Sequence, residues 1–176
     1  MDERAERLAR GDQEAFAELY DACADRVHHY LVVRLGSRTD ADDVLQETFV
    51  RLARTRSKLA NVENLTGYVF ATARNEAIRF VERLGRQNRL RAGPTAEALF
   101  EEASGDDLQA RESAEWVAAS LARLSPDLRE VVELKIYAGL TFREIGEVTG
   151  LPQGTAATRY RSALETMRGQ MSKELE

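Results

Sequence analysis

Apolar residues recur at three- and four-residue intervals along the first half of this chain, a spacing that predicts amphipathic helices. One helix is predicted over residues 12–34, and Gly36 is expected to end it. A second helix is predicted to open with Thr39 and Asp42, which have the spacing of a capping box. A third is predicted to run to about Arg89. Together with a short N-terminal helix, these segments predict an antiparallel helical bundle.

The last third of the chain predicts a helix-turn-helix. Its apolar positions ahead of the motif are Trp116, Val117, Leu121, Leu124, Leu128, Val131, Val132, Leu134 and Ile136. Thr141 and Glu144 form a capping box at the start of one short helix, and Gly150 is expected to end that helix. Gly146 falls where the two helices of the motif must approach closely. An ordinary helical hairpin with a glycine-containing turn is the alternative.

These patterns predict an all-α protein with two small helical domains. The first domain is predicted over residues 1–91 and the second over residues 113–176. Residues 92–112 combine Gly, Pro, Ser and acidic residues with little apolar periodicity, so they predict a flexible acidic linker.

Composition and charge narrow the class of protein. Of the 176 residues, 31% are charged and only 3 are proline, which favours a soluble and largely helical chain. The net charge of −5 divides into +1 over residues 1–91, −5 over 92–112 and −1 over 113–176. Because phosphate neutralisation supplies most non-specific affinity for DNA, two nearly neutral domains should bind duplex weakly alone. A partner that supplies affinity is therefore implied.

Several classes of protein do not fit the sequence. No stretch approaches the roughly 20 apolar residues that span a bilayer, and the charged N-terminus lacks the apolar core of a signal peptide. We therefore expect a cytoplasmic protein without membrane insertion.

The single Cys23 excludes an internal disulfide, and its apolar spacing favours a buried side chain. His28 and His29 are adjacent and cannot easily share a metal. With no catalytic motif either, we expect no enzyme activity, small-molecule substrate, cofactor or metal site.

Three groups of polar residues are candidates for binding. Asp43, Gln46 and Glu47 lie at i, i+3 and i+4, which makes one helical stripe suited to a basic partner helix. Arg79, Arg83 and Arg86 form a basic stripe suited to a phosphate backbone. The second helix of the helix-turn-helix carries Gln153, Thr155, Thr158, Arg159 and Arg161, which can contact base edges and phosphates. For the first two groups the alternative is a solvated charged face, and in the basic stripe the arginines would then pair with Glu76 and Glu82.

With these segments in order, the chain resembles the extracytoplasmic-function (ECF) sigma factors of bacterial RNA polymerase. The resemblance rests on DADDVLQETFVRLAR at 40–54, GYVFATARNEAIRFVER at 67–83 and LSPDLREVVELKIYAGLTFREIGEVTGLPQGT at 124–155. It covers nearly the whole chain. It implies a sigma-2-like bundle followed by a sigma-4-like helix-turn-helix domain, acting as a non-enzymatic factor that directs promoter-specific transcription initiation.

The resemblance also implies partners and binding residues. The partners are core RNA polymerase, through its largest-subunit clamp helices and its flap region, promoter DNA, and an anti-sigma factor. The polymerase-binding residues are Asp43, Gln46, Glu47 and Arg51. Those for the −10 promoter element are Lys58, Asn61, Asn64, Tyr68, Arg74, Asn75, Arg79, Arg83 and Arg86. Those for the −35 element are Arg143, Gln153, Gly154, Thr155, Thr158, Arg159 and Arg161. The acidic linker is expected to follow the basic product channel of the polymerase.

The chain departs from the family pattern at a few positions. Tyr68 stands where Trp is more common, and Ala71 stands where a basic residue is common. Ala156 and Ala157 replace an aliphatic and a basic residue in the recognition helix, so looser packing and altered base reading are expected. Two other functions stay open. One is an autonomous helix-turn-helix regulator that binds an operator as a dimer. The other is an adaptor that binds polymerase without reading bases.

Overall fold

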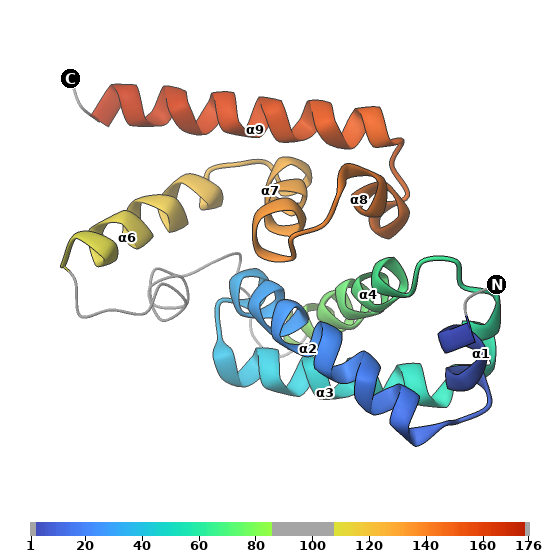
Figure 1. Ribbon diagram of the computed structural model, residues 1–176. Helices are drawn as coiled ribbons and strands as arrows, with labels where there is room; N and C mark the ends of the chain where they lie inside the picture. The colour runs from blue at the N-terminus through green and yellow to red at the C-terminus, as the bar shows by residue number, and fades with distance from the viewer. Residues whose placement is uncertain (1–2, 86–107, 175–176) are drawn as a thin grey trace.

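The computed structural model describes residues 3–85 and 108–174, and every regular element in these two ranges is helical, which confirms the all-α prediction (Figure 1). The elements are α1 (Glu3–Ala9), α2 (Gln13–Leu35), α3 (Arg38–Arg54), the 3₁₀ helix η1 (Arg56–Asn61), α4 (Leu65–Gly85), α6 (Leu108–Ala122), α7 (Pro126–Val132), the π-helix η2 (Glu133–Tyr137), α8 (Phe142–Thr149) and α9 (Gln153–Glu174). None of the helices in the described ranges combines the length and apolar character needed to cross a bilayer. Arg86 and residues 92–107 of the predicted linker lie outside the described residues.

The first half is a bundle in which α2, α3 and α4 pack on one another, while α1 packs against η1 at one end (Figure 1). Its core is apolar, as the three-and-four spacing predicts, and includes the buried Cys23. Burial raises the pKa of the Cys23 thiol above its ordinary value. Gly36 ends α2 in the left-handed conformation, with φ of 66° and its N–H bonded to the Val32 carbonyl.

The predicted cap of α3 is wrong. Ser37, not Thr39, is the N-cap, and its hydroxyl accepts a hydrogen bond of 3.3 Å from the Asp40 N–H. The extended backbone of Ser37 leaves its side chain free to reach back over the first turn, as an N-cap must. Asp42 instead lies beside His28, with 2.9 Å between its Oδ1 and the His28 Nε2.

The second half begins earlier than the sequence pattern indicates, because α6 starts at Leu108, inside the predicted linker. Gln109, Ala110 and Arg111 are good helix formers, and the Gly, Pro and Ser residues on which the linker prediction rests all precede Leu108. The burial predicted for Ile136 is also wrong, since this side chain is 54% exposed. The π-helical turn of η2 adds a residue to the turn and rotates Ile136 outward, while Leu134 stays buried.

The helix-turn-helix follows the predicted geometry. In α8 the Thr141 hydroxyl accepts from the Glu144 N–H, and the Glu144 carboxylate accepts from the Thr141 N–H, so the capping box is confirmed. Gly150 ends α8 with φ of 77°. A Cβ on Gly146 would lie 2.6 Å from the Leu151 carbonyl oxygen, which confirms the predicted close approach.

The two halves are packed against each other through α4 with α8 and α2 with η2 (Figure 1). One continuous apolar cluster contains Phe70 and Ala73 of α4 together with Ile145 and Val148 of α8. In this arrangement α7 and α8 lie between α9 and the bundle, and α9 runs along the outside of the molecule (Figure 1). The face of α4 that meets α8 is therefore covered by the second half.

Gly146→Ala is expected to lower the free energy of unfolding by about 1–3 kcal/mol, because the added methyl group collides with backbone and cannot be relieved by a side-chain rotation. Gly169→Ala in α9 is the matched control, since a Cβ there meets nothing within 4 Å. That substitution should be neutral or stabilising by up to about 1 kcal/mol. Urea unfolding followed by circular dichroism measures both. Equal effects at the two glycines would contradict the close approach.

Candidate protein and nucleic-acid interfaces

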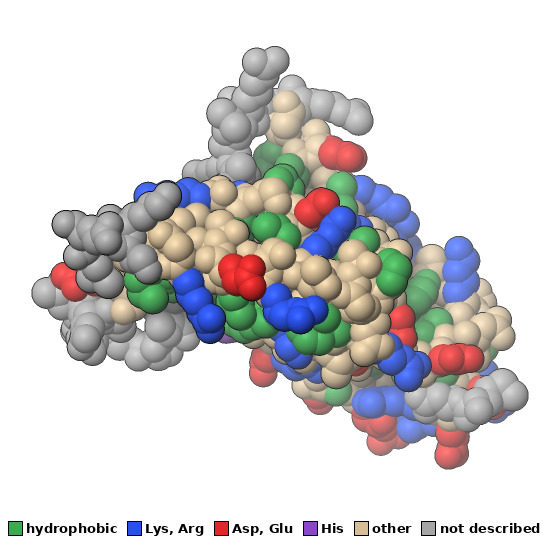
Figure 2. All heavy atoms as spheres, turned by 90° about the horizontal axis from the view of Figure 1, so that it is seen from above, with side chains coloured by type: hydrophobic (Ala, Val, Ile, Leu, Met, Phe, Trp, Pro, Cys, Tyr) green, Lys and Arg blue, Asp and Glu red, His purple; other side chains and the backbone are tan. Residues whose placement is uncertain are grey.

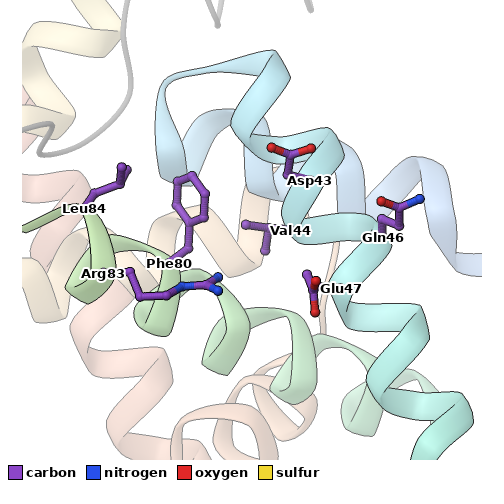
Figure 3. Close-up of a pocket in the computed structure, with 7 residues that line it drawn as sticks. All are labelled: Asp43, Val44, Gln46, Glu47, Phe80, Arg83 and Leu84. Atoms are coloured by element: carbon purple, nitrogen blue, oxygen red, sulfur yellow. The ribbon is translucent and has the colours of Figure 1, made fainter. Parts of the chain in front are cut away.

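The polar stripe of α3 faces solvent beside a hollow between α3 and α4. Asp43, Gln46 and Glu47 are exposed, and together with Phe80, Arg83, Val44 and Leu84 they line a hollow of about 380 Å³ (Figure 3). The Arg83 side chain extends from α4 toward α3, and Glu47 points back toward α4 (Figure 3). Apolar side chains line part of the hollow, and its polar side chains are two acids, Asp43 and Glu47, besides Gln46 and the cation of Arg83. This surface can receive a helix that carries both basic and apolar side chains.

Arg51, the fourth residue predicted to bind polymerase, lies on the neighbouring turn of α3 and is held by a carboxylate of α4. Glu76 is only 4% exposed, and its Oε1 lies 2.5 Å from both Arg51 Nε and Arg79 Nη1. Arg51 and Arg79 come from two different predicted sites, so Glu76 joins the docking helix to the helix predicted to contact DNA. From the sequence, Glu76 was expected only as a possible partner of the α4 arginines. Its contact with Arg51 depends on how α3 packs on α4, which spacing along the chain does not indicate.

The residues predicted for the loop ahead of α4 divide into two groups. Lys58 and Asn61 are exposed on η1. Asn64 is already engaged: its Oδ1 accepts from the Gly67 N–H at the start of α4, and its Nδ2 donates to Glu147 Oε2 of α8 at 2.6 Å. The ring of Tyr68 is half-buried against the apolar core. The structure therefore leaves Lys58 and Asn61, but not Asn64, open for a ligand.

The polar side chains predicted to bind DNA from α4 also point in two directions. Asn75, Arg79 and Arg83 are exposed, and the Arg83 guanidinium lies 5.9 Å from the centre of the Phe80 ring. Arg74 instead turns toward the second half. Its Nε and Nη2 donate to the two carboxylate oxygens of Glu130 in α7, at 2.8 and 3.0 Å. Such a bidentate pair is among the stronger charge-assisted contacts in proteins.

The Arg74–Glu130 pair belongs to an ionic network between the halves that the sequence analysis missed. Arg34 of α2 donates to Glu133 Oε2 at 2.9 Å and to Glu130 Oε1 at 3.4 Å. Glu133 is fully buried, and burial raises the pKa of its carboxyl, while Arg34 opposes that shift. Arg26 of the same helix donates twice to the Ala138 carbonyl, which closes η2. The available signal was an acidic pair at i and i+3, Glu130 and Glu133, which interrupts the apolar positions of the run LREVVELKIY.

The outer face of α9 carries the predicted base-reading residues. Gln153, Gly154, Thr158 and Arg161 are exposed, and Thr155 is half-buried. The Thr158 hydroxyl donates to the Gly154 carbonyl at 2.9 Å. Figure 2 looks onto this side of the molecule and shows separate basic side chains with few acidic ones among them. This is a surface with scattered cations, not one continuous basic patch.

Two of the cations predicted to contact the −35 element are bound by acids of the same half. Arg159 Nη2 lies 3.2 Å from the Asp127 carboxylate at the start of α7, and Arg143 Nε lies 3.1 Å from the Glu147 carboxylate in α8. Both pairs are largely exposed, so they are weak and can exchange with another anion.

Ala156 is fully buried in the apolar cluster, whereas the side chain of Ala157 is half-buried.

Both halves match families defined on sigma factors. Residues 19–87 match Sigma-70 region 2, and residues 114–167 match Sigma-70, region 4. The ECF RNA polymerase sigma factor BldN of Streptomyces coelicolor is 29% identical over 170 residues, which are 95% of this chain and 64% of BldN. The ECF RNA polymerase sigma factor SigW of Bacillus subtilis is 25% identical over 96% of this chain and 95% of SigW. The ECF RNA polymerase sigma factor SigK of Mycobacterium tuberculosis is 27% identical over 96% of this chain and 91% of SigK.

Two solved structures share the fold. CnrH, in complex with the cytosolic domain of CnrY, superposes with a TM-score of 0.70 and 21% identity over 97% of this chain and 96% of that chain. The sigma factor RpoE of Bartonella quintana, in complex with the anti-sigma factor NepR, superposes with a TM-score of 0.64 and 17% identity over 91% of this chain and 96% of that chain.

Glu76→Ala is expected to lower the free energy of unfolding by about 1–3 kcal/mol, because it leaves Arg51 and Arg79 close together without their shared counter-charge. Glu82→Ala, six residues further along the same helix, is the control, since Glu82 is exposed. We expect that change to stay within about 0.5 kcal/mol. Thermal and urea unfolding measure the difference. If Glu76→Ala leaves the free energy of unfolding unchanged, the carboxylate does not join α3 to α4.

Proposed function

This chain belongs to the ECF sigma factors, and we propose that its first half docks on core RNA polymerase while α4 and α9 together select the promoter. The observation that carries the proposal is the order of the two matches within one chain, with region 2 at residues 19–87 and region 4 at residues 114–167. An autonomous regulator needs only the second of these. The first half, with its exposed acidic stripe on α3, has a use only if a protein partner binds there.

The docking surface on α3 is proposed to receive the clamp helices of the polymerase largest subunit. Asp43, Gln46 and Glu47 support this role because all three are exposed on one side of a hollow that is partly lined by apolar side chains. The two acids of the α3 stripe attract a basic helix over a distance, and the apolar side chains of the hollow add contact area once the helix has arrived. Arg51 reaches the same surface from its place beside Glu76.

Two separate surfaces are proposed to read the promoter. The exposed Lys58, Asn61, Asn75 and Arg83 would contact the −10 element, with Arg79 beside them. The exposed start of α9, with Gln153 and Gly154, would enter the major groove at the −35 element. Bound to polymerase, the two weak surfaces act together, because each raises the effective concentration of the other.

Ion pairs within the chain explain why a partner is needed for tight DNA binding. Several of the cations proposed to meet DNA already contact an acid of the chain: Arg79 contacts Glu76, Arg143 contacts Glu147, and Arg159 contacts Asp127. A cation that is neutralised within the protein adds little to non-specific DNA affinity. We therefore propose that the free protein binds DNA weakly and that polymerase supplies the missing affinity.

We further propose that the protein has no catalytic activity of its own and works in the cytoplasm, where the polymerase carries out the chemistry. An anti-sigma factor is the third proposed partner, as RpoE of Bartonella quintana is held by NepR in its structure. The docking stripe on α3 and the outer face of α9 are the exposed surfaces on which such a partner could compete with polymerase and DNA.

Purified core RNA polymerase with this protein should produce transcripts from a genomic promoter library that core alone does not produce. The transcripts should share paired upstream and downstream motifs, because two surfaces at a set separation read the DNA. In a gel-shift assay without core, the protein should leave duplex DNA unshifted. A shift by the protein alone, with no new transcripts, would favour the autonomous regulator instead.

A pair of charge variants makes the same experiment specific to the docking stripe. Asp43→Lys with Glu47→Lys places like charges opposite a basic helix, so affinity for core should fall at least about ten-fold. Asp21→Lys with Asp25→Lys alters the net charge equally at exposed positions of α2 and should bind core normally. If core binding tolerates the first pair as well as the second, polymerase docks elsewhere. If the unmodified protein binds core but its transcripts lack shared motifs, the chain is an adaptor.

Gln153→Ala and Arg161→Ala should affect transcription in different ways. Gln153 is proposed to contact a base edge, so its loss should relax the preference at one position of the upstream motif by about 1–3 kcal/mol. Arg161 is proposed to contact phosphate, so its loss should weaken all promoters about equally and reduce the salt dependence. Randomised upstream elements in the transcription assay separate the two patterns. If both variants lose the same amount of transcription and the upstream motif stays unchanged, Gln153 does not contact a base.

A further inference from the structure

The first helix of the chain carries none of the residues proposed to bind polymerase or DNA. The match to Sigma-70 region 2 begins at residue 19, whereas α1 covers Glu3–Ala9. This helix lies at one end of the bundle and packs against η1 (Figure 1). The exposed Lys58 and Asn61, which belong to the proposed −10 surface, are both on η1. The helix α1 therefore contacts the element that presents part of that surface.

The conformation of η1 depends on tertiary contacts. It is a 3₁₀ helix of six residues, and runs of this helix beyond three or four residues are uncommon because their hydrogen bonds are poorly aligned. Among the described elements, η1 packs mainly on α1. Its buried side chain, Leu59, lies in the same apolar cluster as Ala5 and Leu8 of α1, and all three are fully buried. An apolar contact with α1 thus fixes the middle of η1 on the bundle.

The start of η1 is fixed against the turn that joins α1 to α2. A Cβ on Gly11 would lie 3.1 Å from the Nε of Arg56, so the glycine leaves the space in which the Arg56 side chain lies. Arg56 is the first residue of η1, and its Nη1 donates to the Ala53 carbonyl at 3.5 Å. Both α1 and the turn after it therefore bear on the position of η1.

Polar contacts of Arg7 hold α1 on α2. A helix of seven residues is not stable alone, so its position depends on what it contacts. Arg7 Nε donates to Asp12 Oδ2 at 2.8 Å, and Arg7 Nη1 donates to Glu18 Oε1 at 3.2 Å. The Arg7 guanidinium lowers the pKa of the Asp12 carboxyl, whose Oδ1 accepts from the N–H groups of Glu14 and Ala15 at the start of α2. With α1 set on α2, the position of η1 is set as well.

We infer that α1 is a positioning element for reading of the −10 element, because by holding η1 on the bundle it determines where Lys58 and Asn61 are presented. The inference rests on the proposed function and extends it to a segment with no binding residue of its own. Base discrimination requires donors and acceptors held at hydrogen-bonding distance, whereas attraction between a cation and phosphate tolerates movement. A loosened η1 should therefore lose base preference before it loses all affinity.

Hydrogen exchange of the free protein tests the positioning itself. Leu8→Ala removes buried apolar volume from α1, and Leu31→Ala makes the same change near the other end of α2 as a control, since both leucines are fully buried. The amides of η1 should exchange at least about ten-fold faster in Leu8→Ala, relative to those of α4, because local opening becomes easier. In Leu31→Ala the ratio of η1 to α4 exchange should stay as in the unmodified protein.

Core-dependent transcription from promoters with a randomised downstream element tests the consequence. Leu8→Ala should lower the base preference at the contacted positions about three- to ten-fold and leave the upstream motif unchanged. Leu31→Ala should keep both motifs at a temperature at which thermal unfolding shows both variants folded. Leu8→Met conserves the side-chain volume and should restore the downstream preference. If Leu8→Ala does not fold, Leu8→Val with Leu31→Val is the milder matched pair.

Three outcomes would overturn the inference: unchanged η1 exchange in the Leu8 variant, an unchanged downstream motif, or an equal loss of downstream preference in the Leu31 variant. The last would show that general loss of stability is the cause. Absence of factor-dependent transcription with the unmodified protein would instead overturn the proposed function. Because η1 exchange is measured without polymerase, the two failures are distinguishable.

Discussion

The way the two halves meet depends on one buried carboxylate. Glu133 is fully removed from solvent, and Arg34 of α2 is the counter-charge that reaches it. Placing a carboxylate in a protein interior costs several kcal/mol unless a cation compensates it, so α2 and η2 are held to one relative position. We interpret this pair as determining the orientation of the halves, while the apolar residues between α4 and α8 supply most of the attraction.

The backbone geometry around Glu133 also stabilises the contact between α2 and η2. The π-helical turn of η2 places Glu133 and Leu134 inward, and the Arg26 guanidinium binds the carbonyl at which the turn ends. Once η2 is seated on α2, α8 lies over α4, and the helix-turn-helix is directed away from the bundle with α9 outermost (Figure 1). The contact between η2 and α2 is not proposed to bind DNA, yet it determines where the proposed DNA-binding surfaces lie.

The sequence predicted most features that arise from neighbouring residues, although not the Ser37 cap of α3, and it missed those that arise from contacts between distant elements. The capping box of Thr141 and the close approach at Gly146 follow from short-range rules, and both were predicted. The exposure of Ile136 follows from a π-helical turn, which no 3.6-residue periodicity indicates. The candidate surfaces were predicted as residue types on helix faces. That Arg74 would meet Glu130 depends on how two halves pack, and spacing along the chain holds no information about that.

Acids that never touch a promoter can set how strongly this protein binds one. Asp127 and Glu147 each hold an arginine of the second half, and Glu76 holds two arginines of the first. Losing or gaining one such acid changes the number of cations available to phosphate while every base-reading side chain stays the same. Promoter strength and promoter sequence can therefore diverge independently in evolution, the first through these acidic neighbours and the second through the exposed face of α9.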